Sequence, residues 1–161
     1  MQRVHLPGLS VREVTMIATI ILAAGSSSRM GVPKQLLPIC DRPMIWRVAD
    51  CACKAGLGQV IVVTGSYTAE ISQALTGLNV IIAVNHEWQG GQSTSLRAGL
   101  KKVDHKAEAV LFMLADQPLI TPSMLKTIAA EHHTRRSSIV VPAFGDKRGN
   151  PVLFDLRRWQ D

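Results

Sequence analysis

The chain has 161 residues, of which 47% are hydrophobic and 19% are charged, and its formal net charge is +6 at pH 7. This length and composition predict one globular domain with a core of its own, and the net positive charge favours an anionic ligand. The basic residues form no block of like charge, and only one Tyr and three Phe could stack on bases. These features argue against nucleic acid as the main partner and favour a small polyphosphate.

The cysteines, the histidines and the apolar segments bear on the location of the protein. Cys40, Cys51 and Cys53 form no Cys-x-x-Cys pair, and no histidine cluster completes a zinc site, so we expect reduced thiols. We place His132 and His133 at a solvated helix end. The longest apolar stretch is too short to span a bilayer, and the N-terminal segment lacks the apolar core of a signal peptide. We therefore predict a cytoplasmic protein that does not contact a membrane.

Strand-like and helical segments alternate along the chain. The run IATIILAA at 17–24 is continuous and rich in β-branched residues, as expected for a strand buried on both faces. Further strand-like apolar runs occupy 59–65, 79–85, 109–115, 138–143 and 151–154. Helical spacing of apolar residues occurs between the first five of these strands, at 43–55, 68–77, 93–103 and from Thr121 onward.

Capping residues mark several helix ends. Gly56 is expected to end the first helix, because glycine adopts the left-handed conformation of a helix C-cap without strain. Ser93 is expected to cap the third helix and Thr121 the fourth, since a hydroxyl can accept a hydrogen bond from the first turn. Asp155, directly after the last strand, is expected to cap a further short helix.

The alternation predicts an α/β fold with a mostly parallel sheet and helices on both faces. We treat 16–161 as one domain and 1–15 as a flexible leader. In sheets of this kind, ligands bind at the carboxyl ends of the strands. The candidate positions for a site are therefore after Ala24, after Val84, after Ala115 and around Gly149.

The segment LAAGSSSRMGVPKQLLP at 22–38 follows the first strand. Gly25 and Gly31 allow the backbone amides between them to turn toward an anion, and the serine hydroxyls add donors. Arg29 can contact phosphate oxygens with its planar guanidinium, and Lys34 adds a mobile point charge. The spacing matches neither a Walker loop nor the dinucleotide fingerprint. We favour anion binding over an ordinary surface turn.

This segment resembles the Leu-Ala-Ala-Gly-x-Ser-x-Arg-Met-Gly-x-x-Lys signature of nucleotidyltransferases. GGQSTSLRAGL at 90–100, LADQP at 114–118 and RGNPVLF at 148–154 narrow the likeness to the MobA-like and MocA-like branch, which holds molybdenum cofactor cytidylyltransferase and its relatives. The resemblance runs from about Ile17 to Phe154. It implies a three-layer Rossmann-like fold of the nucleotide-diphospho-sugar transferase type.

The resemblance also implies roles for individual residues. Arg29 and Lys34 would be catalytic, because they neutralise charge that moves toward the leaving pyrophosphate. Asp116 would hold Mg²⁺, although from the residue alone a helix or turn cap is an equal alternative. The implied nucleotide-binding residues are Leu22, Ala23, Ala24, Gly25, Ser26, Ser27, Ser28, Arg29, Met30, Gly31, Lys34, Gly90, Gly91 and Ser95.

Two of these stretches also have simpler interpretations. Ser95 would lie near the base, while plain helix capping explains the serines of the same stretch and is compatible with that role. Arg148, Gly149 and Asn150 would bind the acceptor substrate, although a hairpin turn explains Gly149 and Asn150 nearly as well. Both interpretations stay open on the sequence.

The reaction that the resemblance implies is nucleotidyl transfer, in which a phosphate monoester attacks a nucleoside triphosphate and pyrophosphate leaves. Ala-Ala-Gly in the first motif resembles the cytidylyl members, so the implied nucleotide is CTP, the acceptor is molybdopterin cofactor and a molybdoenzyme is a candidate client. Transfer to a sugar phosphate or to methylerythritol phosphate is one alternative, since the latter family shares PKQ at 33–35. A non-catalytic maturation factor that carries a nucleotide or cofactor is the other.

Relatives of this kind usually run a few dozen residues further, so the resemblance implies a shortened chain. We expect such a loss to expose apolar surface around Leu153, Phe154 and Trp159. Since the loop and Asp116 lie upstream, we also expect nucleotide binding to be retained better than transfer.

Overall fold

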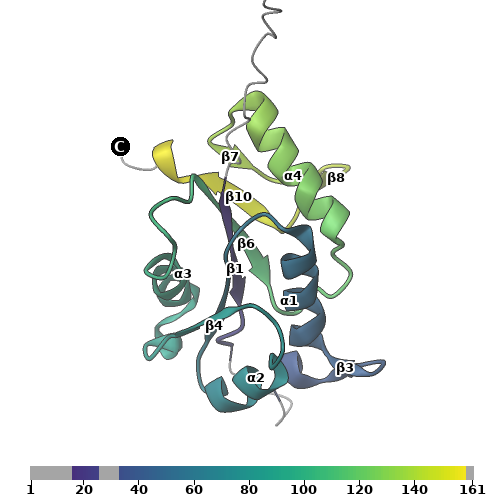
Figure 1. The fold of residues 1–161 in the computed structure, drawn as a ribbon, viewed down its shortest axis with the longest axis vertical. Helices are drawn as coiled ribbons and strands as arrows, with labels where there is room; N and C mark the ends of the chain where they lie inside the picture. The colour runs from purple at the N-terminus through teal and green to yellow at the C-terminus, as the bar shows by residue number, and fades with distance from the viewer. Residues whose placement is uncertain (1–15, 26–32, 159–161) are drawn as a thin grey trace, which may run out of the picture.

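The structure of the protein is a computed structural model that describes residues 16–25 and 33–158. The predicted leader, 1–15, lies outside the described residues. The described part is built on a six-stranded sheet in the order β5-β4-β1-β6-β10-β7 (Figure 1). Its strands are β1 (Ile17–Leu22), β4 (Val60–Thr64), β5 (Ile81–Val84), β6 (Ala109–Leu114), β7 (Ile139–Val140) and β10 (Val152–Asp155).

Most of this sheet is parallel. β1 lies between β4 and β6 and runs parallel to both, and β5 continues the parallel arrangement beyond β4. β10 runs antiparallel to its two neighbours. The strand order reverses at β1, because the chain adds β4 and β5 on one side of it and β6 on the other. Leu22 pairs with Val63 and with Leu114, so the carboxyl ends of three strands meet at one edge.

In the described residues, four α-helices cover the two faces of the sheet (Figure 1). Helices α1, α2 and α4 lie on one face, where Ile45, Ile71 and Leu125 belong to one buried core. Helix α3 lies on the other face, where Leu96 packs against a second core that contains Ile20. The helices are α1 (Met44–Ala55), α2 (Thr68–Ala74), α3 (Gln92–Leu100) and α4 (Pro122–Arg135). The predicted three-layer α/β fold is confirmed.

The helix ends follow the predicted caps with one exception. α1 ends at Gly56, whose φ is 64°. At the start of α4, the hydroxyl of Thr121 accepts a hydrogen bond from a backbone N–H of the first turn. α3 has no side-chain cap and begins directly after Gly91. The predicted cap by Ser93 is therefore wrong, because this helix begins earlier than expected and Ser93 lies inside its first turn.

Shorter elements join the sheet to the helices. The turn-rich segment between the last two strands forms the β8–β9 hairpin, and another short ribbon, β2–β3, precedes α1. These elements are η1 (Lys34–Leu36), β2 (Pro38–Ile39), β3 (Arg42–Pro43), η2 (Trp88–Gly90), β8 (Ala143–Phe144), β9 (Lys147–Arg148) and η3 (Leu156–Arg158).

Strand β10 lies inside the sheet. Leu153 is fully buried because it pairs with β6 on one side and with β7 on the other. The predicted exposure of Leu153 is therefore wrong. Phe154 is half-buried, and its ring packs edge-to-face on Phe112 with 5.7 Å between the centroids. Trp159 lies outside the described residues.

Asp155 links β10 to η3 and α4. Its Oδ1 accepts a hydrogen bond from the backbone N–H of Arg157 at 2.9 Å, which confirms the predicted cap. The Arg157 guanidinium also donates to both carboxylate oxygens and holds the pKa of Asp155 below its ordinary value. Nε2 of His132 lies 3.7 Å from Oδ2 of Asp155, and both side chains are buried. The predicted solvated position is wrong for His132 and holds for His133, which is exposed.

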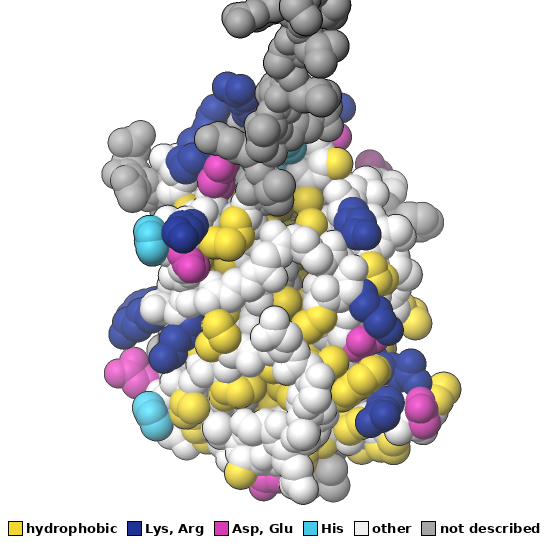
Figure 2. Space-filling view, in the orientation of Figure 1, with side chains coloured by type: hydrophobic (Ala, Val, Ile, Leu, Met, Phe, Trp, Pro, Cys, Tyr) yellow, Lys and Arg dark blue, Asp and Glu magenta, His cyan; other side chains and the backbone are white. Residues whose placement is uncertain are grey.

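On the face shown in Figure 2, Lys and Arg side chains lie along both margins, with uncharged and hydrophobic side chains between them. No helix within the described ranges combines the length and the apolar character needed to cross a membrane. The three cysteines are free thiols. Burial raises the pKa of Cys51 to about 11.

Candidate active site

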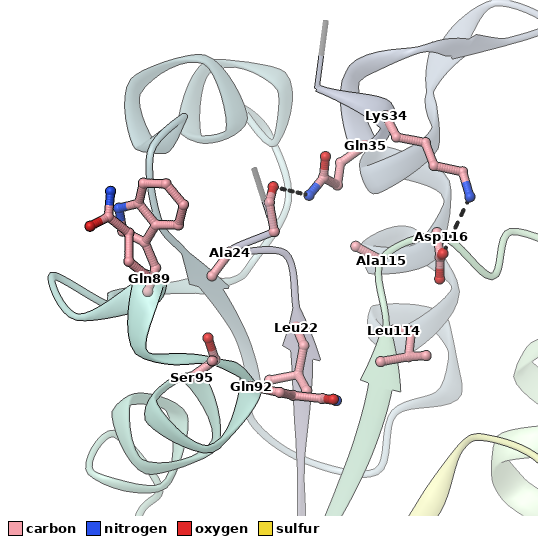
Figure 3. Close-up of a pocket in the computed structure, with 13 residues that line it drawn as sticks. Leu22, Ala24, Lys34, Gln35, Gln89, Gln92, Ser95, Leu114, Ala115 and Asp116 are labelled. Atoms are coloured by element: carbon pink, nitrogen blue, oxygen red, sulfur yellow. Dashed lines mark hydrogen bonds and ion pairs between the residues drawn. The ribbon is translucent and has the colours of Figure 1, made fainter. Parts of the chain in front are cut away.

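A pocket of about 530 Å³ opens at the carboxyl ends of β1 and β6 (Figure 3). These two strands lie at the point where the strand order reverses, which is where open α/β sheets bind their ligands. Ala24 follows β1, while Ala115 and Asp116 follow β6. The segment after Val84 also contributes Trp88, Gln89 and Gly91, so three of the four positions predicted from the sequence meet in this pocket.

One side of the pocket carries two opposite charges. The Nζ of Lys34, on η1, donates to Oδ2 of Asp116 at 3.3 Å (Figure 3). The side chains of Lys34 and Asp116 are 48% and 45% exposed, so both remain within reach of a ligand. Asp116 pairs with Lys34, and Thr121 caps α4 instead. Because an ammonium binds phosphate oxygens and a carboxylate binds cations, this side suits a metal–phosphate group.

Gln35 holds the backbone that follows β1. Its side chain is buried, and Nε2 donates to the carbonyl oxygen of Ala23 at 3.1 Å and to that of Gly25 at 3.0 Å. Figure 3 shows Gln35 between Ala24 and Lys34. Since these carbonyls are bonded to an amide, the backbone at the start of the 22–38 segment has a defined direction.

The opposite side of the pocket is polar and neutral. Gly91 has a φ of 97°, a left-handed conformation that turns η2 into α3. The first turn of α3 then brings Ser95 to the pocket, where its hydroxyl accepts a hydrogen bond from Nδ2 of Asn85 at 3.0 Å. Figure 3 shows Ser95 and Gln89 across the pocket from Asp116. Neutral hydrogen-bonding groups on this side suit a nucleobase.

Trp88 gives the neutral side an apolar wall. A Cβ at Gly65 would lie 2.7 Å from the carbonyl oxygen of Ala24 and 3.0 Å from Cβ and Cγ of Trp88. Only a residue without a side chain therefore allows this close approach. The indole is half-buried against the second core and offers a flat surface on which a base or sugar can pack.

Most of the predicted site residues that the structure describes lie together. Ala23 is buried in the first core, and Gly90 directly precedes the lining residue Gly91. The predicted residues Ser26, Ser27, Ser28, Arg29, Met30 and Gly31 lie outside the described residues. The predicted residues that line the pocket are Leu22, Ala24, Gly25, Lys34, Gly91, Ser95 and Asp116.

The predicted acceptor segment, Arg148 to Asn150, is not on this lining. The turn of the β8–β9 hairpin lies at Gly145 and Asp146. The backbone N–H of Gly149, after β9, donates to the carbonyl of Pro142 at 2.9 Å. The hairpin-turn interpretation of Gly149 and Asn150 is therefore wrong. Val152 pairs with Phe112 in the antiparallel register of β10 and β6, so the preceding Asn150 lies toward the carboxyl end of β6.

Sequence reasoning assigned no role to six lining residues; four of them lie inside the quoted motifs, and Trp88 and Gln89 directly precede one. Gln35 directly follows Lys34, and the two glutamines of α3 and η2 flank the Gly-Gly pair. Their place in or beside a motif was the available signal, because no charge or unusual spacing distinguishes these residues. The missed residues are Gln35, Trp88, Gln89, Gln92, Leu114 and Ala115.

The side chains of the pocket could hold a metal ion only together with the phosphates of a bound substrate. The described part of the chain has no group of three or more His, Cys, Asp or Glu side chains that could hold a metal ion. On the described lining, Asp116 is the one acidic residue. Mg²⁺ usually keeps several waters and binds one or two carboxylates plus substrate phosphates. Asp116 beside a polyphosphate matches that arrangement.

The architecture is that of the nucleotidyltransferases. A nucleotidyl transferase from Methanothermobacter thermautotroptrophicus superposes with a TM-score of 0.72 at 28% identity, over 87% of this chain and 71% of that one. Residues 19–161 match the MobA-like NTP transferase domain. The chain belongs to this family, as the motifs predicted.

The proteins to which this chain is similar carry names of different kinds. Rv0371c from Mycobacterium tuberculosis is 32% identical with a TM-score of 0.81, over 91% of this chain and 74% of that one, and another structure of it is a complex with manganese. The bifunctional protein GlmU of Sorangium cellulosum is 35% identical over 69% of this chain and 25% of its own length. Nicotine blue oxidoreductase of Paenarthrobacter nicotinovorans is 27% identical over 89% of this chain and 72% of its own. The chain spans about a quarter of the length of the GlmU relatives that it matches.

Proposed function

We propose that the protein transfers the cytidylyl group of CTP to the phosphate of a molybdopterin-type cofactor and releases pyrophosphate. The observation that carries the proposal is the division of the pocket, with Lys34 and Asp116 on one side and Ser95 on the other. A nucleoside triphosphate has the same division, since its phosphates and their metal carry the charge and its base is neutral. The position at the strand reversal supports the same ligand class.

In this reaction, an oxygen of the acceptor phosphate attacks the α-phosphorus of CTP. The bond between that phosphorus and the bridging oxygen breaks, and its electron pair leaves with pyrophosphate. Lys34 would donate hydrogen bonds to the phosphate oxygens as charge moves to the leaving group, together with Arg29. Asp116 would hold Mg²⁺, which when bound neutralises charge on the phosphates.

The finer parts of the proposal have separate support. The choice of CTP as the nucleotide depends on Ala23 and Ala24 in the first motif. The motif resemblance supports the molybdopterin-type acceptor, a molybdoenzyme client and a cytoplasmic location. The acceptor would approach from Arg148, Gly149 and Asn150, which precede β10; the first residue of β10, Val152, pairs with Phe112 of β6. The manganese complex of a 31% identical relative supports a divalent cation, for which we propose Mg²⁺.

A different acceptor and a different class of protein are the alternatives. Transfer to a sugar or polyol phosphate would use the same nucleotide pocket. A relative named as an oxidoreductase shows that membership of the family does not by itself specify the reaction. A carrier that binds a nucleotide or cofactor without turnover is separated from both transferases by measured pyrophosphate release.

Thermal denaturation with each of CTP, GTP, ATP and UTP in the presence of Mg²⁺ tests the nucleotide. A ligand that binds only the folded state raises the apparent Tm by mass action, and we expect CTP to raise it most. Pyrophosphate release is then measured with molybdopterin cofactor, a sugar phosphate and methylerythritol phosphate. Stabilisation by CTP without release from any acceptor would support the carrier. No stabilisation by any triphosphate would refute the proposed function.

A further inference from the structure

Asn85 joins the end of β5 to the first turn of α3. The residue is 4% exposed, and its backbone N–H donates to the carbonyl of Thr64 at 2.8 Å, which continues the sheet. Its Nδ2 donates to the hydroxyl of Thr94 at 2.8 Å and to that of Ser95 at 3.0 Å. Its Oδ1 accepts from the backbone N–H of Glu87 at 3.0 Å. Every polar atom of the amide is therefore used.

These contacts determine which way the Asn85 amide faces. A backbone N–H can only donate, so the atom opposite the N–H of Glu87 must be the carbonyl oxygen. The amide nitrogen must then face Thr94 and Ser95, and both hydroxyls accept from it. A rotated amide would set two donors against each other at Glu87.

The direction of the amide in turn determines what Ser95 can offer. A hydroxyl has one proton to donate, and the hydroxyl of Thr94 has acceptors for its proton in the carbonyls of Gly91, at 2.8 Å, and Glu87, at 2.9 Å. The hydroxyl of Ser95 accepts from Asn85, and no acceptor for its own proton occurs among the residues that the structure describes. Ser95 lines the pocket, so its proton is available to a ligand.

We propose that Asn85 is a positioning residue for the nucleotide, because it makes Ser95 a hydrogen-bond donor to the base. The group on the base that accepts the Ser95 proton is then a ring nitrogen or a carbonyl oxygen. The inference rests on the proposed function, since it assigns the neutral side of the pocket to the base. Asn85 itself does not line the pocket and acts through Ser95.

Asn85→Asp tests this by reversing the polarity of the contact. A carboxylate has no proton, so it accepts from the N–H of Glu87 and from both hydroxyls. Ser95 then directs its proton to the carboxylate and presents only lone pairs to the base. Binding of CTP, UTP, GTP and ATP with Mg²⁺ is measured by isothermal titration calorimetry, and the readout is the ratio of their dissociation constants. Repulsion between the new charge and the triphosphate cancels in this ratio, because all four nucleotides share the triphosphate.

We expect Asn85→Asp to change the ratio between the dissociation constant of the preferred nucleotide and those of the others by about three- to tenfold, which corresponds to one neutral hydrogen bond. Ser95→Ala should change the ratio similarly, and the double variant should change it no further than Ser95→Ala. Thr94→Val is the matched control, because it removes the other hydroxyl that is hydrogen-bonded to Asn85. Thr94 does not line the pocket, so this substitution should leave the ratio of dissociation constants unchanged.

Three results would overturn the inference. The four affinities could fall by one common factor in Asn85→Asp, the effects of the two substitutions could multiply in the double variant, or Thr94→Val could change the ratio as much as Ser95→Ala. If Asn85→Asp has no cooperative thermal transition, the comparison of Ser95→Ala with Thr94→Val decides. Wild-type protein that binds none of the four triphosphates would refute the proposed function and this inference with it.

Discussion

Lys34→Ala is expected to separate catalysis from stability. Its Nζ lies 3.3 Å from Oδ2 of Asp116, and both side chains are about half exposed. Exposed ion pairs contribute about 0–1 kcal/mol, so the free energy of unfolding should fall by about 1 kcal/mol or less. Loss of one preorganised donor to the transition state costs roughly 100-fold or more in rate, about 2.7 kcal/mol. We therefore expect kcat/KM to fall roughly 100-fold while the protein stays folded.

The assay compares two lysines that have similar partners. Lys54 on α1 also pairs with a carboxylate, that of Asp50 at 2.7 Å, but it does not line the pocket. Pyrophosphate release and urea unfolding are measured on wild type, Lys34→Ala and Lys54→Ala. Both variants should show similar small losses of stability, and only Lys34→Ala should lose turnover. Near-wild-type turnover in Lys34→Ala would remove this lysine from the mechanism.

Asp116, Gly99 and Cys51 each give a further testable prediction. Asp116→Asn should abolish metal-dependent pyrophosphate release and change the free energy of unfolding by less than about 1 kcal/mol, since its ion pair is exposed. Gly99→Ala should cost about 1–3 kcal/mol in urea unfolding, because the added Cβ would lie 2.7 Å from Cγ2 of Ile20. Burial raises the pKa of Cys51 to about 11, so Cys51 should react with a thiol reagent at pH 8 far more slowly than the exposed Cys40 does. Equal rates for the two thiols would contradict the burial of Cys51.

The layers of the fold and the place of the site were predictable, because both follow from patterns that are local in sequence. Continuous apolar runs such as 17–24 indicate strands buried on both faces, and the helical patterns between them imply parallel connections. Because parallel α/β sheets bind ligands at the carboxyl ends of their strands, the ends of β1 and β6 could be predicted as part of the site. Gly56 and Thr121 were predictable for the same reason, since a cap acts on its own helix.

The errors and omissions concern contacts between residues far apart in the chain. His132 is buried beside Asp155, which lies on a strand that follows much later, with 3.7 Å between Nε2 and Oδ2. Leu153 is buried because β10 inserts between β6 and β7, which no local pattern reveals. Gln35 lies inside the 22–38 segment and Asn85 ends a predicted strand, but neither was assigned a role, because an amide carries no charge. Their roles depend on partners 10 to 12 residues away in a different element.

These two amides have a common physical reason for their place beside the pocket. Gln35 and Asn85 are 6% and 4% exposed, and each connects the end of a strand to the loop or helix that follows it. A charged side chain could make similar contacts, but burying it would cost more than burying an amide. It would also add a field beside the triphosphate. An amide supplies donors and an acceptor without charge, so Lys34 and Asp116 remain the charged groups on the described lining. Neutral support of this kind lets the two sides of the pocket keep their different electrostatic character, which is what a ligand with a charged end and a neutral end requires.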